Sequence, residues 1–129
     1  MEALQIQLGK FERSVDRLKE VLKRRREDDE IVLDATIQRF EFVFENAWKS
    51  IKLALKVLGI EALSPRECIK KAYRQGWVDD EEALLELLKA RNLTSHTYSE
   101  PIAESVYTAV KENVPIFEEL LKALKGLPC

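Results

Sequence analysis

The chain has 129 residues and a formal net charge of −2, from 21 basic and 23 acidic side chains. This length suits one domain, residues 1–129, which can bury a core without disulfides or metals. The balanced charge excludes a global positive field for nucleic acid, so such a contact needs a local patch. With one histidine and two distant cysteines, we expect no metal site and no cofactor. The lack of a secretory signal, a transit peptide and a long apolar run indicates a cytoplasmic protein that binds no membrane.

The first predicted element is a long amphipathic helix, because apolar residues recur at steps of four and three from residue 4 to residue 22. The basic run 23–26 and the acidic run 27–30 follow it. Positive charge suits the end of one helix and negative charge suits the start of the next. A contact with RNA is a second interpretation of the basic run, but we favour a solvated turn.

A second helix is expected from about residue 31 to residue 58, with Gly59 as its C-cap. Its apolar stripe includes Phe40, Phe44 and Trp48. Phe42 does not fit on the same face, so a second apolar face remains. Unburied apolar surface of this kind favours an interface, and we expect a homodimer.

Shorter helices are predicted in the second half of the chain. Ser64 and Glu67 are spaced as a capping box around a third helix that Gly76 closes. Asp79 or Asp80 caps a fourth helix rich in leucine. The last helix is expected to start near residue 99 and to run to residue 124, with a kink or an interruption at Pro115.

No stretch alternates as a strand, so the predicted fold class is all-α. Short connections favour antiparallel neighbours. We therefore expect an up-and-down antiparallel helical bundle of four main helices and one short helix.

The segment RNLTSHTY, residues 91–98, contains the single histidine. On a regular helix, Arg91, Ser95 and Tyr98 share a face, whereas His96 points roughly 140° away from Arg91. Thr and Ser hydroxyls compete for backbone groups, so Leu93, Thr94 and Ser95 make a poor helix. We predict a distortion or a helix end near residues 94–95, which would bring the arginine and the histidine closer.

These residue types suit cleavage of RNA without a metal. A histidine takes the proton of a 2′-hydroxyl, and an arginine holds the adjacent phosphate. Asn92, Ser95 and Tyr98 offer hydrogen bonds, and a symmetric dimer would supply a second histidine. The alternative is a helix cap with a surface hydrogen bond. Glu41 and Glu45 either reach this segment or form a solvated helix edge, and we favour the edge.

The pattern Arg91-Asn92-x-x-x-His96-x-Tyr98 resembles the R-x4-H-x-Y motif of HEPN toxins that are paired with minimal nucleotidyltransferases. The segments RFEFVFENAWKSIK (39–52), SPRECIKKAYRQGWVDD (64–80) and ARNLTSHTYSE (90–100) are similar to the nucleotidyltransferase substrate-binding protein family. This resemblance implies a homodimer with a nucleotidyltransferase partner and a metal-independent ribonuclease activity. It also implies that Arg91 and His96 cleave, that Asn92 assists, and that AMP on Tyr98 silences the enzyme.

Two other functions stay open. The older family name implies a non-enzymatic subunit that binds a substrate for a nucleotidyltransferase. A structural helical dimer is the third possibility. The chain lacks the Gly-Ser and paired-aspartate motif of the transferases, because Asp79 and Asp80 are adjacent and suit a cap. We therefore do not expect the chain itself to be a nucleotidyltransferase.

Overall fold

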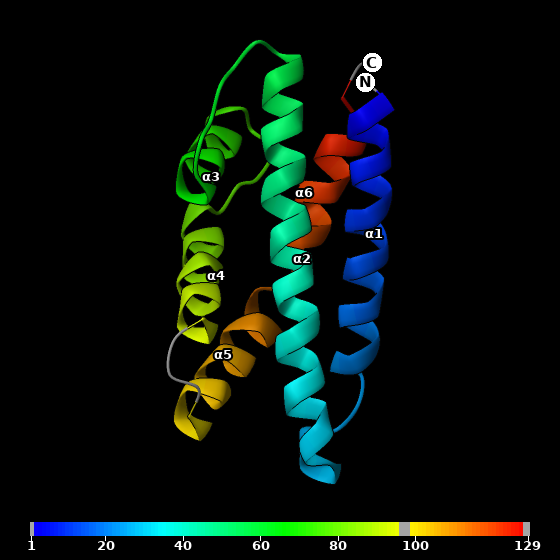
Figure 1. Cartoon of the computed structure of the whole chain (residues 1–129), viewed down its shortest axis with the longest axis vertical. Coiled ribbons are helices and arrows are strands. Elements are labelled where there is room, and N and C mark those ends of the chain that lie inside the picture. Colours follow the sequence, from blue (N-terminus) through cyan, green and yellow to red (C-terminus); the bar gives the residue numbers. More distant parts are fainter. Residues whose placement is uncertain (1, 96–98, 128–129) are drawn as a thin grey trace.

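A computed structural model describes residues 2–95 and 99–127 of the chain (Figure 1). In this part there are six α-helices, one 3-10 helix and no strand, which confirms the predicted all-α class. The elements in chain order are α1 (Glu2–Leu22), η1 (Arg26–Asp28), α2 (Glu30–Val57), α3 (Pro65–Arg74), α4 (Glu81–Thr94), α5 (Glu100–Asn113) and α6 (Pro115–Lys125).

The longest helix, α2, runs the length of the molecule and touches α1, α3, α4, α5 and α6. Helix α1 lies antiparallel to α2 and packs on both α2 and α6 (Figure 1). Helices α3 and α4 follow one another on the other side of α2, and α5 crosses obliquely below them. None of the helices in the described part is long and apolar enough to cross a membrane.

The last helix is interrupted at Pro115, as predicted, and forms two helices, so the described residues contain six α-helices and not four main helices with one short one. Helix α5 ends at Asn113, and Pro115 occupies the first turn of α6. A proline has no N–H to donate and crowds the preceding turn. The chain therefore changes direction at Pro115, and α6 returns to pack against α1 and α2.

The predicted start and stop signals are confirmed. The Ser64 hydroxyl accepts a hydrogen bond from the Glu67 N–H at 3.1 Å, and Asp80 accepts one from the Ala83 N–H at 3.0 Å. Gly59 and Gly76, with φ angles of 77° and 80°, directly follow the C-caps of α2 and α3, which are Leu58 and Gln75 and not the glycines themselves. Only glycine adopts this left-handed conformation without strain.

An aromatic cluster holds α6 in the core. The Phe117 ring lies 6.4 Å from the Phe11 ring and 6.4 Å from the Phe40 ring, measured between centroids. All three side chains are fully buried. Trp77 is buried as well. The cluster joins α1, α2 and α6.

Candidate functional site

The motif arginine, Arg91, lies in the last turn of α4, close to the position where the sequence predicts a distortion or a helix end. The helix ends at Thr94, and Ser95 is its C-cap. The Thr94 hydroxyl donates to the Arg91 carbonyl at 2.7 Å, and the Ser95 hydroxyl donates to the Asn92 carbonyl at 2.9 Å. These side chains occupy carbonyls at the end of the helix, so the prediction of a helix end near residues 94–95 is confirmed.

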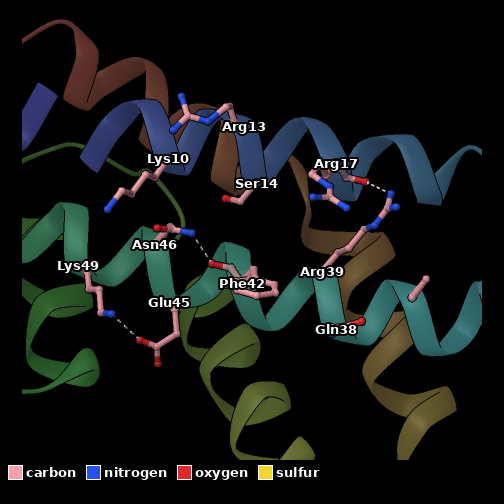
Figure 2. Close-up of a pocket in the computed structure, with 11 residues that line it drawn as sticks. Lys10, Arg13, Ser14, Arg17, Gln38, Arg39, Phe42, Glu45, Asn46 and Lys49 are labelled. Atoms are coloured by element: carbon pink, nitrogen blue, oxygen red, sulfur yellow. Dashed lines mark hydrogen bonds and ion pairs between the residues drawn. The ribbon is translucent and has the colours of Figure 1, made fainter. Parts of the chain in front are cut away.

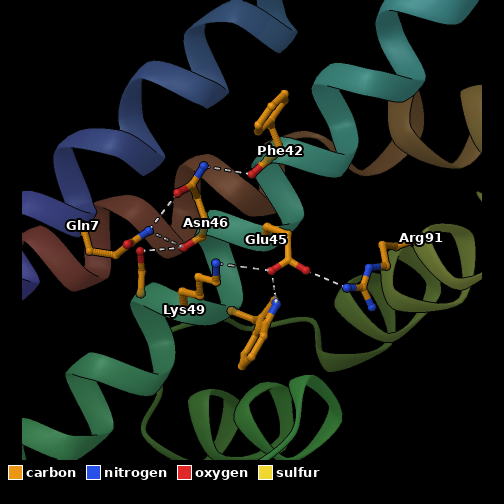
Figure 3. A network of polar contacts seen from close by, with 8 residues as sticks. Gln7, Phe42, Glu45, Asn46, Lys49 and Arg91 are labelled. Atoms are coloured by element: carbon orange, nitrogen blue, oxygen red, sulfur yellow. Dashed lines mark hydrogen bonds and ion pairs between the residues drawn. The ribbon is translucent and has the colours of Figure 1, made fainter. Parts of the chain in front are cut away.

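The carboxylate of Glu45, on α2, fixes the Arg91 guanidinium. Arg91 Nη2 donates a hydrogen bond to Glu45 Oε1 at 2.6 Å (Figure 3). The guanidinium carbon also lies 5.9 Å from the centre of the Phe44 ring, within reach of a cation–π contact. The Arg91 side chain is 31% exposed. It is therefore held in place, and part of it still faces solvent.

Glu45 contacts three side chains. Besides Arg91, its Oε2 accepts from the Trp48 indole N–H at 3.1 Å and lies 3.8 Å from Lys49 Nζ (Figure 3). The predicted pair along the helix edge is present with Lys49, but the favoured interpretation of Glu45 as only a solvated edge is wrong. The spacing from Glu45 to Trp48 and Lys49 accounts for these local contacts alone. This spacing does not indicate that α4 packs on α2 at the position of Glu45.

The other predicted site residues divide into two groups. Asn92 and Ser95 belong to the described part, and the Asn92 side-chain oxygen lies 3.4 Å from Arg91 Nη1. His96 and Tyr98 lie outside the described residues. The predicted approach of His96 to Arg91 and the place of Tyr98 therefore stay predictions.

The described site offers a cation that is fixed by two hydrogen bonds within the described residues, to Glu45 at 2.6 Å and to Asn92 at 3.4 Å. A guanidinium has five N–H donors in a planar fork. A fork of this shape suits the two oxygens of a phosphate. Across residues 2–95 and 99–127, no group of three His, Cys, Asp or Glu side chains lies close enough together to hold a metal ion.

Comparisons with known proteins give a consistent picture. The family model described as nucleotidyltransferase substrate binding protein like matches residues 6–126. The probable ribonuclease HepT of Haemophilus influenzae is 29% identical over 99 residues, which are 73% of this chain and 68% of HepT. A solved structure from Thermus thermophilus has a TM-score of 0.80 at 31% identity, covering 89% of this chain and 98% of that one.

A second solved structure is informative for the fold alone. The tri-AMPylated HEPN toxin of Shewanella oneidensis, solved in complex with the MNT antitoxin, has a TM-score of 0.79 with this chain. The match covers 98% of this chain and 99% of the toxin at 15% identity. This chain therefore shares its helical arrangement with that protein.

Proposed function

Because the chain belongs to the family of nucleotidyltransferase substrate binding protein-like proteins, we propose that it is the HEPN-type subunit of a two-component, toxin–antitoxin-like module. Its partner is a minimal nucleotidyltransferase. Similarity to the probable ribonuclease HepT and the fold shared with a toxin in complex with MNT support this pairing. The activity we propose is metal-independent cleavage of RNA. It is carried by one observation, the fixed guanidinium of Arg91 at the start of the R-x4-H motif.

The proposed chemistry uses the motif side chains. His96 accepts the proton of a 2′-hydroxyl, and the 2′-oxygen forms a bond to the adjacent phosphorus. The bond from phosphorus to the 5′-oxygen breaks, and that oxygen takes a proton. Arg91 stabilises the charge that gathers on the phosphate oxygens. One histidine per chain favours a homodimer in which a second His96 supplies this last proton.

The silencing step that we propose is AMP transfer to Tyr98 by the partner. The Tyr98 hydroxyl loses its proton to solvent, and its oxygen forms a bond to the α-phosphorus of ATP. The bond from this phosphorus to the oxygen that bridges to the β-phosphate breaks, and pyrophosphate leaves. The added phosphate carries negative charge and bulk close to Arg91 in the sequence. It would occupy the phosphate site and repel RNA.

One experiment tests the proposal. One sample of the purified chain is treated with the nucleotidyltransferase and ATP, and a second sample is left untreated. Each sample is then incubated with labelled RNA in excess EDTA. The intact mass of the chain is measured in both samples. We expect cleavage without metal, then a mass increase of AMP and loss of cleavage. Tyr98→Phe should gain no AMP and stay active. No cleavage before treatment, or cleavage only with added metal, contradicts the ribonuclease assignment.

The family description itself favours a second candidate, a non-enzymatic subunit that binds substrate for the transferase. In that case the chain forms a stable complex with the nucleotidyltransferase, and the RNA stays intact in the same EDTA assay. The RNA assay therefore separates the two candidates directly.

Glu45 is a positioning residue in the proposed enzyme, since it holds Arg91 without facing the reacting atoms. We expect Glu45→Ala to lower kcat about ten- to a hundredfold, because the reaction slows by about this factor when a group such as the Arg91 guanidinium is displaced from its productive position. Glu45→Gln should restore most of the rate, since its amide oxygen still accepts from Arg91 Nη2. The check is kcat and KM for both variants. Equal losses in the two variants would contradict a role through this hydrogen bond.

A further inference from the structure

An open groove of about 670 Å³ lies between α1 and α2 on the surface of the molecule (Figure 2). We call it the α1–α2 groove. The residues that line it and are used below are Lys10, Arg13 and Arg17 from α1, and Arg39, Phe42, Glu45 and Lys49 from α2.

The α1–α2 groove is strongly positive although the chain as a whole is not. Five cationic side chains line it, against the single carboxylate of Glu45. Within the part of the chain that the structure describes, Lys10, Arg13 and Arg17 form no ion pair. Arg39 reaches across to donate to the Arg17 carbonyl at 2.7 Å. A local field of this kind attracts a polyanion.

An exposed aromatic ring stands among these cations. Phe42 is 62% exposed, whereas Phe40 and Phe44 on the same helix are buried. Figure 2 shows the Phe42 ring in the groove between the α1 cations and Glu45. Proteins that bind single-stranded nucleic acid combine a positive groove for the phosphates with an aromatic ring on which a base stacks.

The α1–α2 groove joins two other features. At one end it shares Ala35 and Arg39 with a second hollow, which Lys23 and Arg24 of the basic run also line. From Lys10 to Leu22, α1 rises about 18 Å. At the other side lies Glu45, which holds Arg91. The groove thus extends from the basic run after α1 to a carboxylate that also contacts the motif arginine, although Arg91 is not among the residues that line the groove.

We propose that the α1–α2 groove binds single-stranded RNA, with phosphates on Arg13 and Arg17 and a base on Phe42, and leads it to Arg91. This inference rests on the proposed function and names the form of its substrate. The sequence favours a homodimer interface at the apolar face of Phe42, but a second copy seated on this groove would set its cations against themselves across a twofold axis. We therefore assign the Phe42 ring to RNA and not to a dimer contact. An acidic protein segment would satisfy the cations, but it would leave the exposed ring without a base.

The test is a direct binding measurement with the full chain in EDTA. The probe is a fluorescent single-stranded 2′-O-methyl RNA, which is not cleaved because it has no free 2′-hydroxyl to attack the adjacent phosphorus. The readout is fluorescence anisotropy. We compare Arg13→Gln/Arg17→Gln with Arg66→Gln/Arg74→Gln, which removes the same charge from α3. The groove variant should raise Kd about tenfold and reduce the log–log salt slope by about 1.4, since each neutralised phosphate contributes about 0.7. The α3 variant should bind like the wild type.

Phe42→Ala tests the stacking part. We expect its Kd for single-stranded RNA to rise about 5- to 150-fold, with no change in Kd for duplex RNA. Equal binding by the groove and α3 variants, no effect of Phe42→Ala, or displacement of RNA by equimolar polyglutamate would overturn the inference.

The outcomes separate this inference from the proposed function. If the wild type binds the probe through the groove but does not cut ordinary RNA, the ribonuclease proposal fails alone. If the wild type cuts RNA and the groove variant binds and cuts like the α3 variant, only the groove inference fails.

Discussion

Alanine in place of His96 is expected to slow RNA cleavage by about 10²- to 10⁴-fold, which is the usual contribution of a positioned general base. The chain has one histidine, so no second imidazole in the same chain replaces it. The measurement is the initial rate of cleavage of a labelled RNA in EDTA. Because the substituted group moves a proton and is not needed to hold the phosphate, the Kd for 2′-O-methyl RNA should stay the same.

Two controls make this result specific. Lys89→Ala changes an exposed cation on α4, the helix that carries Arg91, and should leave the rate unchanged. The urea unfolding midpoint of His96→Ala should match that of the wild type. Wild-type rates in His96→Ala would reject the catalytic assignment and favour the substrate-binding function.

Most helix boundaries could be predicted from the sequence because they depend on local chemistry. The Ser64, Asp80 and Ser99 caps and the two left-handed glycines each act within a few residues of chain. The end of α4 near Ser95 is predictable for the same reason, since its hydroxyl competes for a nearby carbonyl.

The features that could not be predicted depend on how distant helices meet. Glu45 and Arg91 are 46 positions apart, and their contact follows from the packing of α2 on α4. The nearby residues Trp48 and Lys49 can pair with the Glu45 carboxylate without any contact from another helix. The sequence therefore favours the local interpretation of Glu45. The interruption at Pro115 was predicted, but the direction that α6 takes after it was not, because that direction is set by the packing of α6 on α1 and α2.

The α1–α2 groove has a sequence signal that overall charge conceals. Lys10, Arg13 and Arg17 are spaced three and four, so they share one face of α1. What opposes this face is a matter of tertiary structure, and Arg39 comes from the antiparallel α2. The sequence predicts that any contact with nucleic acid needs a local positive patch. The α1–α2 groove is such a patch, but its position was not predicted from the sequence.

Alanine in place of Phe117 is expected to lower the free energy of unfolding by about 3–5 kcal/mol. The ring is fully buried and meets Phe11 edge-on, at an interplanar angle of 89°. Its loss leaves a cavity where α1, α2 and α6 join, and a domain of this size has only about 5–15 kcal/mol of stability. The measurement is urea unfolding followed by circular dichroism. A loss below about 1 kcal/mol would contradict the assigned packing of α6.

Phe42→Ala is the matched control, because it removes the same ring from the surface. Its ring is 62% exposed, so the free energy of unfolding should change by at most about 0.5 kcal/mol. The same variant is expected to weaken RNA binding, whereas Phe117→Ala, studied at a temperature where it is folded, should bind as the wild type does. An exposed ring that adds nothing to stability but much to RNA affinity is a binding residue. If Phe42→Ala instead destabilises the fold as Phe117→Ala does, the ring belongs to the packing, and the α1–α2 groove loses its base-stacking platform.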